Sequence, residues 1–509
     1  MATLTEALLI RDDAFAVCDE AHATPTPARQ GPPRHPAGGS LILAALLSTC
    51  ASCESGPRAP TEVTVDYGSV YQAIEGFGAA GAYDAPEMAA FGQANPAIYD
   101  DLFGMPASGQ GLGLDMLRIR NTYQYPDDTN LAAAGAIATA GKARNPALHI
   151  ALAAWSPSAA LKSNGDVNNG GTLVKDGTAY DYAAYAAWWA DSLTVGWAAV
   201  GVVPDSICIQ NEPDIATDYD SCVFAPSEND TYAGHNLAFD AVHAALAARV
   251  PESLPAVPKM VGPESVGYEA GRSDASASRG ARDYIDNLTA AGKATIYAYA
   301  IHPYADGGGG HSGWDHPDNH LKPMRDFAGD SRYNDKPLWM TEYCRLDQDP
   351  IFDHAVELAW HIHNFLVEMK ATVYVHFPLF RAAGISNGGM VNVDPATGRY
   401  ELRDLYYFFK HYAYFTDPGW SLVGVANNSG NLRVTAFKDP AGHALTVVIL
   451  NKSNATETFP LTVNGFAPAS SQVFLSSATE HWALRGAYAP GEELSLPPMS
   501  IVTIAFVDG

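Results

Sequence analysis

The sequence predicts an α/β protein: a (β/α)8 barrel with an attached β-sandwich domain built from the C-terminus plus N-terminal strands. The first observation is that short apolar runs alternate with longer Ala-rich stretches of helical character from about residue 74 to residue 382. The second is a change after about residue 405, where the segments alternate in polarity or are rich in β-branched residues. Eight strand–helix units followed by short alternating strands are typical of a closed barrel with an all-β neighbour.

Eight apolar runs qualify as barrel strands, because most are followed by Gly, Pro, Asn or Ser and then by a helix candidate. They comprise residues 74–78, 114–120, 148–155, 206–210, 259–262, 296–301, 338–341 and 372–376. Residues 180–195 and 354–369 are the clearest helices, with apolar positions recurring at three and four. The alternative, a doubly wound open sheet, normally has a Gly-rich phosphate-binding turn after its first strand. The Gly-Phe-Gly-Ala-Ala-Gly stretch at 76–81 matches that turn poorly.

The C-terminal region has the pattern of a β-sandwich. Segments 432–437, 444–450 and 500–506 are alternating or β-branched and are separated by turn clusters. Segments 63–67 and 70–73 precede the barrel but resemble these strands, so we expect them to pair into the C-terminal domain. The predicted divisions are a leader and linker over residues 1–60, sandwich strands over 61–75, the barrel over 76–404 and the sandwich over 405–509.

The N-terminal region predicts export from a bacterial cell. Residues 20–38 are rich in Pro, Ala and Gly without periodicity, which indicates disorder. The apolar run at 40–50 is too short to span a membrane and suits the core of a signal peptide. Leu47-Ser-Thr-Cys50 resembles a lipobox, in which Cys50 would carry a lipid anchor; a conventional signal peptide is the alternative. We therefore expect a secreted protein or an outer-surface lipoprotein.

Composition and cysteine content narrow the function classes. The formal net charge is −26, which disfavours nucleic acid as a partner because phosphates would meet a repulsive field. Cys208, Cys222 and Cys344 follow the leader without metal-ligand spacing. Cys222 and Cys344 are expected in loops near the site, either as a disulfide or as free buried thiols. We expect no cofactor and no metal, and a monomer is the default.

Two glutamates stand at the C-terminal ends of predicted strands four and seven. Glu212 lies in Ile-Cys-Ile-Gln-Asn-Glu-Pro-Asp, and Glu342 lies in Leu-Trp-Met-Thr-Glu-Tyr-Cys. Side chains at that edge of a barrel point into a common mouth. Hydrolysis of a glycosidic bond needs one carboxylic acid to protonate the leaving oxygen and one carboxylate to meet the oxocarbenium ion. Most glutamates are surface charges, but each of these ends an apolar run at the matching edge, which favours catalysis.

A series of motifs then resembles glycoside hydrolase family 30, and most closely its bacterial glucuronoxylan-type endo-β-1,4-xylanases. The matching stretches are residues 72–78, 155–162 with 169–171, 209–214, 261–265 and 339–343, within a resemblance that covers about residues 62–509. This resemblance implies a barrel with a tightly attached β-sandwich and retaining chemistry without a catalytic metal. It also implies that Glu212 is the acid/base and Glu342 the nucleophile.

Residues beside the glutamates acquire roles from this placement. Asn211 is expected to hydrogen-bond the sugar 2-OH, a contact that strengthens in the transition state. Trp155 is expected to form an aromatic wall for the sugar, with barrel-rim packing as the alternative. Arg120, at the end of strand two, is expected to hold Glu342 ionised, with a structural ion pair as the alternative.

The segment after strand six supplies two more candidates. His302 and Tyr304 are expected to orient Glu342, although a purely structural histidine is an equal alternative for His302. Glu264, after strand five, is expected to support the site from behind rather than to touch the sugar.

Arg381 bears on the substrate. The resemblance implies that an arginine in the loop after strand eight recognises a glucuronate side group, and Arg381 occupies the matching place. Two departures weaken that implication. His376 and Phe377 stand where the relatives have paired tryptophans, and the loop lacks their adjacent arginine and tyrosine.

Three hypotheses of function follow. The first is a retaining hydrolase that cleaves β-1,4-xylan by double displacement. The second is a related β-glycosidase for a β-1,6-glucan or galactan, or an exo-acting xylan hydrolase. The third is an inactive surface glycan-binding lipoprotein, which is disfavoured because both glutamates are present.

Overall fold

The computed structural model describes residues 60–126, 129–268, 280–305, 316–345, 352–382 and 389–508. The predicted leader with Cys50 lies outside the described residues. The described chain from Thr61 onward belongs to one compact unit. Within the described ranges, no helix is long and apolar enough to cross a membrane.

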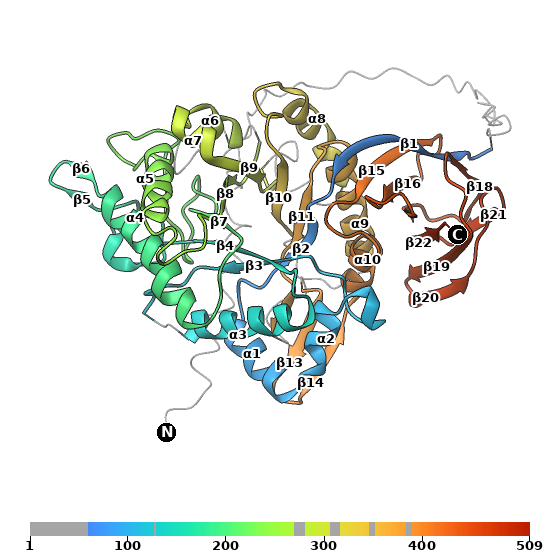
Figure 1. Ribbon diagram of the computed structural model, residues 1–509, viewed down its shortest axis with the longest axis horizontal. Helices are drawn as coiled ribbons and strands as arrows, with labels where there is room; N and C mark the ends of the chain where they lie inside the picture. Colours follow the sequence, from blue (N-terminus) through green and yellow to red (C-terminus); the bar gives the residue numbers. More distant parts are fainter. Residues whose placement is uncertain are drawn as a thin grey trace, which may run out of the picture. The chain divides into compact units, whose positions relative to one another are not determined.

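Eight parallel strands close into a barrel, as the sequence predicts (Figure 1). Each predicted apolar run overlaps one of these strands, and the bounds differ by a few residues at most ends. In order around the barrel the strands are β10 (Leu338–Tyr343), β11 (Val373–His376), β2 (Gly76–Ala80), β3 (Met116–Arg120), β4 (His149–Ala153), β7 (Ser206–Cys208), β8 (Lys259–Ser265) and β9 (Ile296–Ile301). All strand–helix connections therefore bring the carboxyl ends of the strands to one face.

Helices follow the strands along the chain and surround the barrel. They are α1 (Ala85–Ala94), α2 (Ala97–Phe103), α3 (Thr129–Arg144), α4 (Tyr182–Asp191), α5 (His235–Ala247), α6 (Ala281–Asp286), α7 (Ala290–Thr295), α8 (Leu321–Gly329), α9 (Asp353–Val367) and α10 (Asp404–Ala413). The two clearest sequence predictions correspond to α4 and α9. Helix α4 begins where the Asp181 side chain accepts a hydrogen bond from the Ala184 amide at 2.8 Å, a standard N-cap.

Helix α10 begins at Asp404, in the segment where the sequence predicts the change from barrel to sandwich. Helix α10 packs against β2, where the Phe77 ring lies 6.3 Å from Phe409 and 6.2 Å from Tyr412. Between β11 and α10 the chain also forms a small sheet that the sequence analysis did not predict. Its strands are β12 (Phe380–Ala382), β13 (Val391–Asp394) and β14 (Arg399–Leu402).

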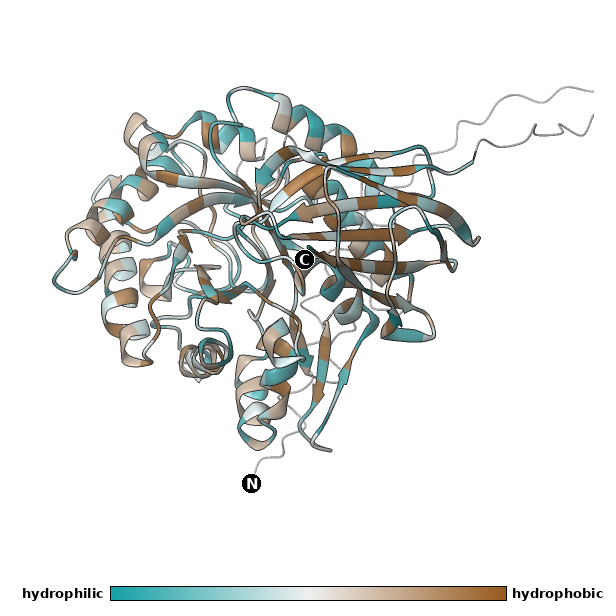
Figure 2. Cartoon of the chain, turned by 45° about the vertical axis from the view of Figure 1, so that its right-hand side comes forward, coloured by the Kyte–Doolittle hydropathy of each residue, from teal (hydrophilic) through white to brown (hydrophobic). Residues whose placement is uncertain are grey.

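A nine-stranded sheet folds around a second apolar core and forms the β-sandwich domain (Figures 1 and 2). The N-terminal segments join it, as predicted, as one strand with irregular register. Strand β1 pairs with β15 in antiparallel and with β18 in parallel orientation. The strands are β1 (Val63–Ala73), β15 (Ser421–Asn427), β16 (Leu432–Lys438), β17 (Ala444–Asn451), β18 (Glu457–Asn464), β19 (Ser470–Ser477), β20 (Glu480–Gly486), β21 (Glu493–Leu496) and β22 (Ser500–Val507).

Buried histidines of two helices form hydrogen bonds with residues of the sandwich. His411 of α10 contacts the hydroxyl groups of Thr503 at 2.8 Å and Ser476 at 2.9 Å. His363 of α9 contacts the Thr435 hydroxyl at 2.8 Å. Each of these ring nitrogens would be costly to bury without a partner, so the contacts fix the helices on the sheet.

A partly buried carboxylate lies at the amino-terminal end of the barrel, opposite the edge where the strands end. Glu75, just before β2, accepts hydrogen bonds from Trp339 at 3.0 Å, Thr372 at 2.8 Å and Tyr297 at 2.6 Å. Lys259 lies 3.5 Å away. Burial alone would raise the pKa of Glu75, but these hydrogen bonds lower it below its usual value. Glu75 therefore ties four barrel strands together as an anion.

Candidate active site

The two glutamates lie at the carboxyl edge of the barrel, at strands four and seven. Glu342 belongs to β10, and Glu212 follows β7 in the segment that leaves the barrel. The Glu212 backbone is in the left-handed region, with φ of 46°, and its amide donates to the Glu264 carbonyl at 3.0 Å. Both side chains are largely shielded, since the residues are 7% and 6% exposed. A backbone turned in this way directs Glu212 back toward the barrel axis.

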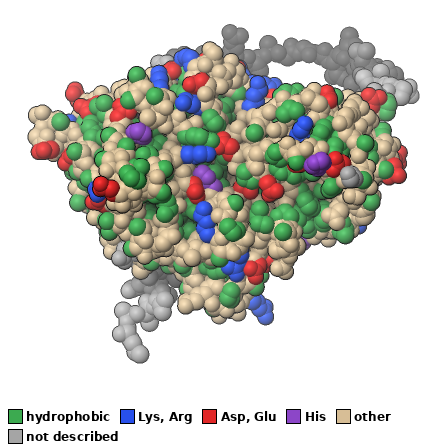
Figure 3. Space-filling view, viewed as in Figure 1, with side chains coloured by type: hydrophobic (Ala, Val, Ile, Leu, Met, Phe, Trp, Pro, Cys, Tyr) green, Lys and Arg blue, Asp and Glu red, His purple; other side chains and the backbone are tan. Residues whose placement is uncertain are grey.

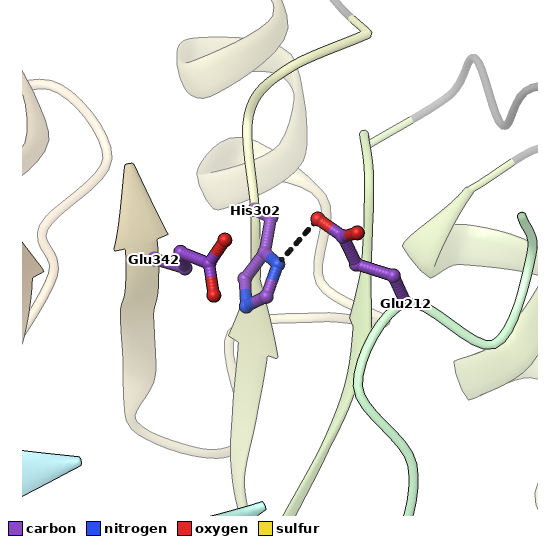
Figure 4. Close-up of side chains that lie close together, drawn as sticks. All are labelled: Glu212, His302 and Glu342. Carbon is purple, nitrogen blue, oxygen red and sulfur yellow. Dashed lines mark hydrogen bonds and ion pairs between the residues drawn. The ribbon is translucent and has the colours of Figure 1, made fainter. Parts of the chain in front are cut away.

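The two carboxyl groups face each other across His302 (Figure 4). One oxygen of Glu212, one oxygen of Glu342 and one ring nitrogen of His302 all lie within 4.8 Å of one another. Retaining glycosidases hold their carboxyl groups about 5–5.5 Å apart, whereas inverting enzymes need about 6.5–9.5 Å to admit a water. The closest oxygens of the two carboxyl groups thus lie nearer than the inverting range, which favours the retaining geometry.

Arg118 of β3 connects the nucleophile candidate to the rest of the site. Its guanidinium donates to Glu342 at 2.7 Å, to Glu264 at 2.7 and 3.3 Å, and to the Asn211 side-chain oxygen at 2.6 Å. It also lies 4.6 Å from the centre of the Trp155 ring. Because Asn211 accepts with its oxygen, its NH2 group is left as a donor, the polarity needed for a sugar hydroxyl.

The residue that holds Glu342 is thus Arg118, and the prediction of Arg120 for that task is wrong. The Arg120 guanidinium instead lies 3.0 and 3.1 Å from the two oxygens of Asp220, and 4.5 Å from the Tyr83 ring. Two residues along a strand share a face but are separated by about 6.6 Å, which is one layer of the barrel. Arg120 therefore reaches the rim, where the ion-pair alternative is correct.

The two residues after strand six contact different glutamates. The Tyr304 hydroxyl donates to Glu342 at 3.2 Å, the contact that the sequence predicts for it. His302 Nδ1 lies 3.0 Å from a Glu212 oxygen, so this ring orients the acid/base candidate and not the nucleophile, contrary to the prediction. Glu264 supports Arg118 from behind, as expected.

The environments of the glutamates differ in the charge that they favour. Burial, the nearby Glu342 carboxylate and Asp214 raise the pKa of Glu212 well above its usual range. Burial also raises the pKa of Glu342, but Arg118 and the Tyr304 hydroxyl oppose that rise. Burial and the Arg118 charge lower the pKa of His302 well below its usual value, so its ring is neutral. Glu212 consequently holds a proton more readily than Glu342 does.

Aromatic side chains form a wall beside the carboxylates. Trp155 and Phe377 are 3% and 4% exposed, and the Tyr83 ring lies 6.2 Å from the first and 6.0 Å from the second. Both contacts are edge-to-face, which aromatic pairs favour. Phe377 thus contributes to the wall at a position where the family resemblance implies a tryptophan.

Arg381 is not placed to clamp a glucuronate in this structure. The residue is 3% exposed, and its Nε lies 2.9 Å from a carboxylate oxygen of Asp84. The same oxygen of Asp84 accepts the Ala382 amide at 3.0 Å. The guanidinium is therefore buried against a protein carboxylate, and the expected role in substrate recognition is corrected. The sequence places Arg381 in the right loop but gives no sign of the acidic partner after strand one.

Lys162 is a structural determinant of the site that the sequence analysis did not single out. Its ammonium group donates to the carbonyls of Val167 at 2.9 Å, Asn168 at 3.2 Å and Ser221 at 2.6 Å. The residue is 2% exposed. It therefore joins the loop after β4 to the loop after β7, which carries Asp220.

The three cysteines of the barrel are free and buried. The possible Cys222–Cys344 disulfide is therefore wrong, and the alternative of buried thiols is correct. Burial raises the pKa of Cys222 to about 12, so the thiol is protonated and unreactive at neutral pH.

Comparison with known proteins agrees with this geometry. A barrel that presents paired carboxylates at strands four and seven, with an attached sandwich, is the architecture of a glycoside hydrolase. Residues 422–504 match the glycosyl hydrolase family 30 beta sandwich domain. The match lies within the β-sandwich domain, and with the geometry of the site it supports a glycoside hydrolase that resembles family 30.

Several solved structures share the complete fold. The catalytic domain of the family 30 xylanase C from Talaromyces cellulolyticus is 19% identical with a TM-score of 0.67, over 88% of this chain and 100% of that one. The family 30 subfamily 8 xylanase from Clostridium acetobutylicum is 21% identical with a TM-score of 0.63, over 88% and 99%. An endo-β-1,6-glucanase is 15% identical with a TM-score of 0.63, over 88% and 95%.

Proposed function

We propose that this protein is a retaining hydrolase of β-1,4-xylan that acts by double displacement, with Glu212 as acid/base and Glu342 as nucleophile. The observation that carries the proposal is the unequal pair of buried carboxyls within retaining distance. One is held as an anion by Arg118 and Tyr304, and the other sits beside a neutral histidine and further carboxylates.

In the first step, the Glu342 carboxylate attacks the anomeric carbon while the proton of Glu212 moves to the glycosidic oxygen. The bond from the anomeric carbon to that oxygen breaks, and a glycosyl ester of Glu342 forms. In the second step, the Glu212 carboxylate removes a proton from water, the water oxygen attacks the anomeric carbon, and Glu342 leaves. Asn211 would donate to the 2-OH through both steps.

A neutral polysaccharide backbone is the substrate class that the site favours. With Arg381 buried against Asp84, the described residues offer no exposed guanidinium from this loop for a substrate carboxylate. On the face shown in Figure 3, basic side chains are interspersed with acidic and apolar ones and form no continuous basic surface. We therefore expect undecorated xylan to be cleaved as well as glucuronoxylan.

A β-1,6-glucan is the second candidate. The fold is as similar to an endo-β-1,6-glucanase as to one of the xylanases, with TM-scores of 0.63 for both. Phe377 in the aromatic wall also departs from the tryptophan that the xylanase resemblance implies. We further propose that the protein acts outside the cytoplasm, where such polysaccharides occur, by secretion or as a surface lipoprotein.

Digestion of defined substrates tests the substrate and the mechanism together. Linear xylan, glucuronoxylan and a β-1,6-glucan are incubated with the protein, and the products are identified by mass and by the initial anomer in NMR. We expect β-anomeric products from both xylans. Release from glucuronoxylan alone would contradict the neutral-backbone proposal, and initial α-anomers would contradict retention.

Substitution of each glutamate assigns its role. Glu342→Gly with azide should yield an α-glycosyl azide, and Glu212→Gly with azide and an aryl glycoside should yield a β-glycosyl azide. The opposite stereochemistry for the two variants would reverse the assignment of acid/base and nucleophile.

A further inference from the structure

His302 and the two glutamates form a cluster whose donor atoms suit a metal ion. One atom from each of Glu212, His302 and Glu342 lies within 4.8 Å of the other two. Figure 4 shows the His302 ring between the two carboxyl groups. The histidine is fully buried, and its Nε2 has no hydrogen-bond partner among the residues that the structure describes. A buried nitrogen of this kind normally has a partner, which points to an additional ligand at this place.

We propose that this cluster binds a divalent first-row transition ion, Zn²⁺ or Cu²⁺, and that the bound ion blocks hydrolysis. The inference goes beyond the proposed function, because the ion would be an inhibitor and not a cofactor. The ion would bind both catalytic carboxylates at once. No acid would then be available to protonate the leaving oxygen, and no nucleophile would be available to attack the anomeric carbon.

The chemistry of the donor set favours this class of ion. A neutral imidazole with two carboxylates suits zinc, copper, nickel or iron, whereas magnesium and calcium prefer oxygen ligands alone. A neutral imidazole has a lone pair on one ring nitrogen that it can donate to the ion. When the ion binds, Glu212 releases its proton to solvent, so charge and protons balance.

The geometry needs a small adjustment. Zinc–nitrogen and zinc–oxygen distances of about 2.0–2.2 Å place ligand atoms about 3.3–3.6 Å apart. The widest pair in the cluster must therefore approach by at most about 1.5 Å. Rotation about the last side-chain torsion of glutamate is soft and can supply this movement.

Arg118 limits the affinity and the choice of ligand atoms. Its guanidinium lies 2.7 Å from Glu342 Oε2, so this oxygen is already engaged and a cation next to it would be repelled. Among the residues that the structure describes, the other oxygen, Oε1, accepts from the Tyr304 hydroxyl at 3.2 Å, a long contact that leaves it able to turn toward the ion. We therefore expect a reversible site that chelators empty.

Direct binding tests the proposal without any substrate. ZnCl2 is titrated into the full chain by isothermal titration calorimetry, and one equivalent of CuCl2 is examined by electron paramagnetic resonance. We expect one zinc per chain and nitrogen hyperfine splitting from one imidazole. His302→Gln should weaken zinc binding at least about tenfold, the loss that even an outer-shell change can cause.

Matched variants make the result decisive. His443→Gln removes a histidine on the sandwich whose side chain is 69% exposed, and it should leave this binding step unchanged. Glu342→Gln removes one anionic ligand and should weaken zinc binding as His302→Gln does. This variant tests the site if the histidine variant does not fold. Equal zinc affinity of wild type and both active-site variants would overturn the proposal.

Activity provides a second, separate readout. Zinc should inhibit turnover of whichever polysaccharide proves to be the substrate, competitively and with recovery on addition of EDTA. Inhibition that excess substrate does not relieve would place the ion elsewhere and overturn the proposal. If no substrate is found, the calorimetric result still decides the metal site, so the two proposals fail independently.

Discussion

Replacing Arg118 with Gln should move the acid limb of the pH–activity profile upward, because this guanidinium keeps the nucleophile ionised. Arg118 is 1% exposed and lies 2.7 Å from Glu342, so little water screens the pair. Removal of the positive charge leaves Glu342 with the Tyr304 hydroxyl as its remaining described side-chain donor. Glu264, which also loses its partner, then adds an uncompensated negative charge nearby.

The size of the shift follows from the distance. Two unit charges whose centres are about 4 Å apart interact by about 4 kcal/mol at an effective dielectric constant of 20. At 1.36 kcal/mol per pKa unit, this corresponds to about 3 units as an upper value. Measured effects of a neighbouring opposite charge are about 1–3 units. We therefore expect the acid limb of kcat/KM to rise by about 1–3 pH units, with a loss of about 3–5 kcal/mol in the free energy of unfolding.

The assay is kcat/KM against pH on an aryl glycoside, with stability measured separately by urea unfolding. Arg120→Gln is the matched control, since it removes the same kind of side chain from the same strand but breaks contacts with Asp220 and the Tyr83 ring and not with Glu342. It should lower stability and leave the acid limb in place. The reasoning is refuted if Arg118→Gln keeps the wild-type limb, or if both variants shift it equally.

Three further predictions concern stability and reactivity. Glu75→Gln should lower the free energy of unfolding by about 1–3 kcal/mol in urea with kcat unchanged, because it removes the anion from four barrel donors; a lower kcat would contradict a structural role. Burial lowers the pKa of His235 and His363 to about 3, so each stabilises the fold above pH 6.5 and progressively less as the pH falls toward 3. At pH 5 each of the two histidines should lower the free energy of unfolding by about 2 kcal/mol relative to pH 6.5, and His235→Phe should make the stability less dependent on pH. Urea midpoints that fall in parallel with pH for the variant and the wild type would contradict this prediction. Cys222 and Cys344 should react with a thiol reagent only after unfolding, and fast labelling of the native protein would show that one of them is accessible.

The barrel could be predicted because its periodicity is repeated eight times. Each apolar run had to be buried, and each was followed by a helical pattern, so local errors did not change the topology. The sheet formed by β12, β13 and β14 escaped prediction because its strands are short and interrupt the eighth unit. Helix α10 was not predicted for a related reason, since its sequence is rich in aromatic residues that suit a sandwich strand or a helix equally well.

The sequence predicts the site residues that lie at the ends of strands. It does not predict a contact that depends on the layer of the barrel that a residue occupies, or on a partner from a distant loop. Glu212 and Glu342 follow from their position alone. Arg118 and Arg120 share one face of β3, so the sequence pattern does not distinguish which layer meets Glu342. A charged residue inside the apolar run Met-Leu-Arg-Ile-Arg was the available signal for Arg118, because such a side chain is buried only when it is paired. The partners of Arg381 and His302 depend on loops far apart in sequence.

In the proposed mechanism, two identical side chains have opposite tasks because their neighbours stabilise opposite protonation states. Glu342 receives hydrogen bonds from a cation and a phenol, both of which favour the carboxylate. Glu212 has a neutral imidazole as its close side-chain partner and two carboxylates nearby, which favour the acid. The first proton transfer therefore has a built-in direction before any sugar binds. Arg118, on strand two, sets this direction because its charge favours the carboxylate form of Glu342. A barrel without this arginine would not distinguish the two glutamates, at strands four and seven, by charge.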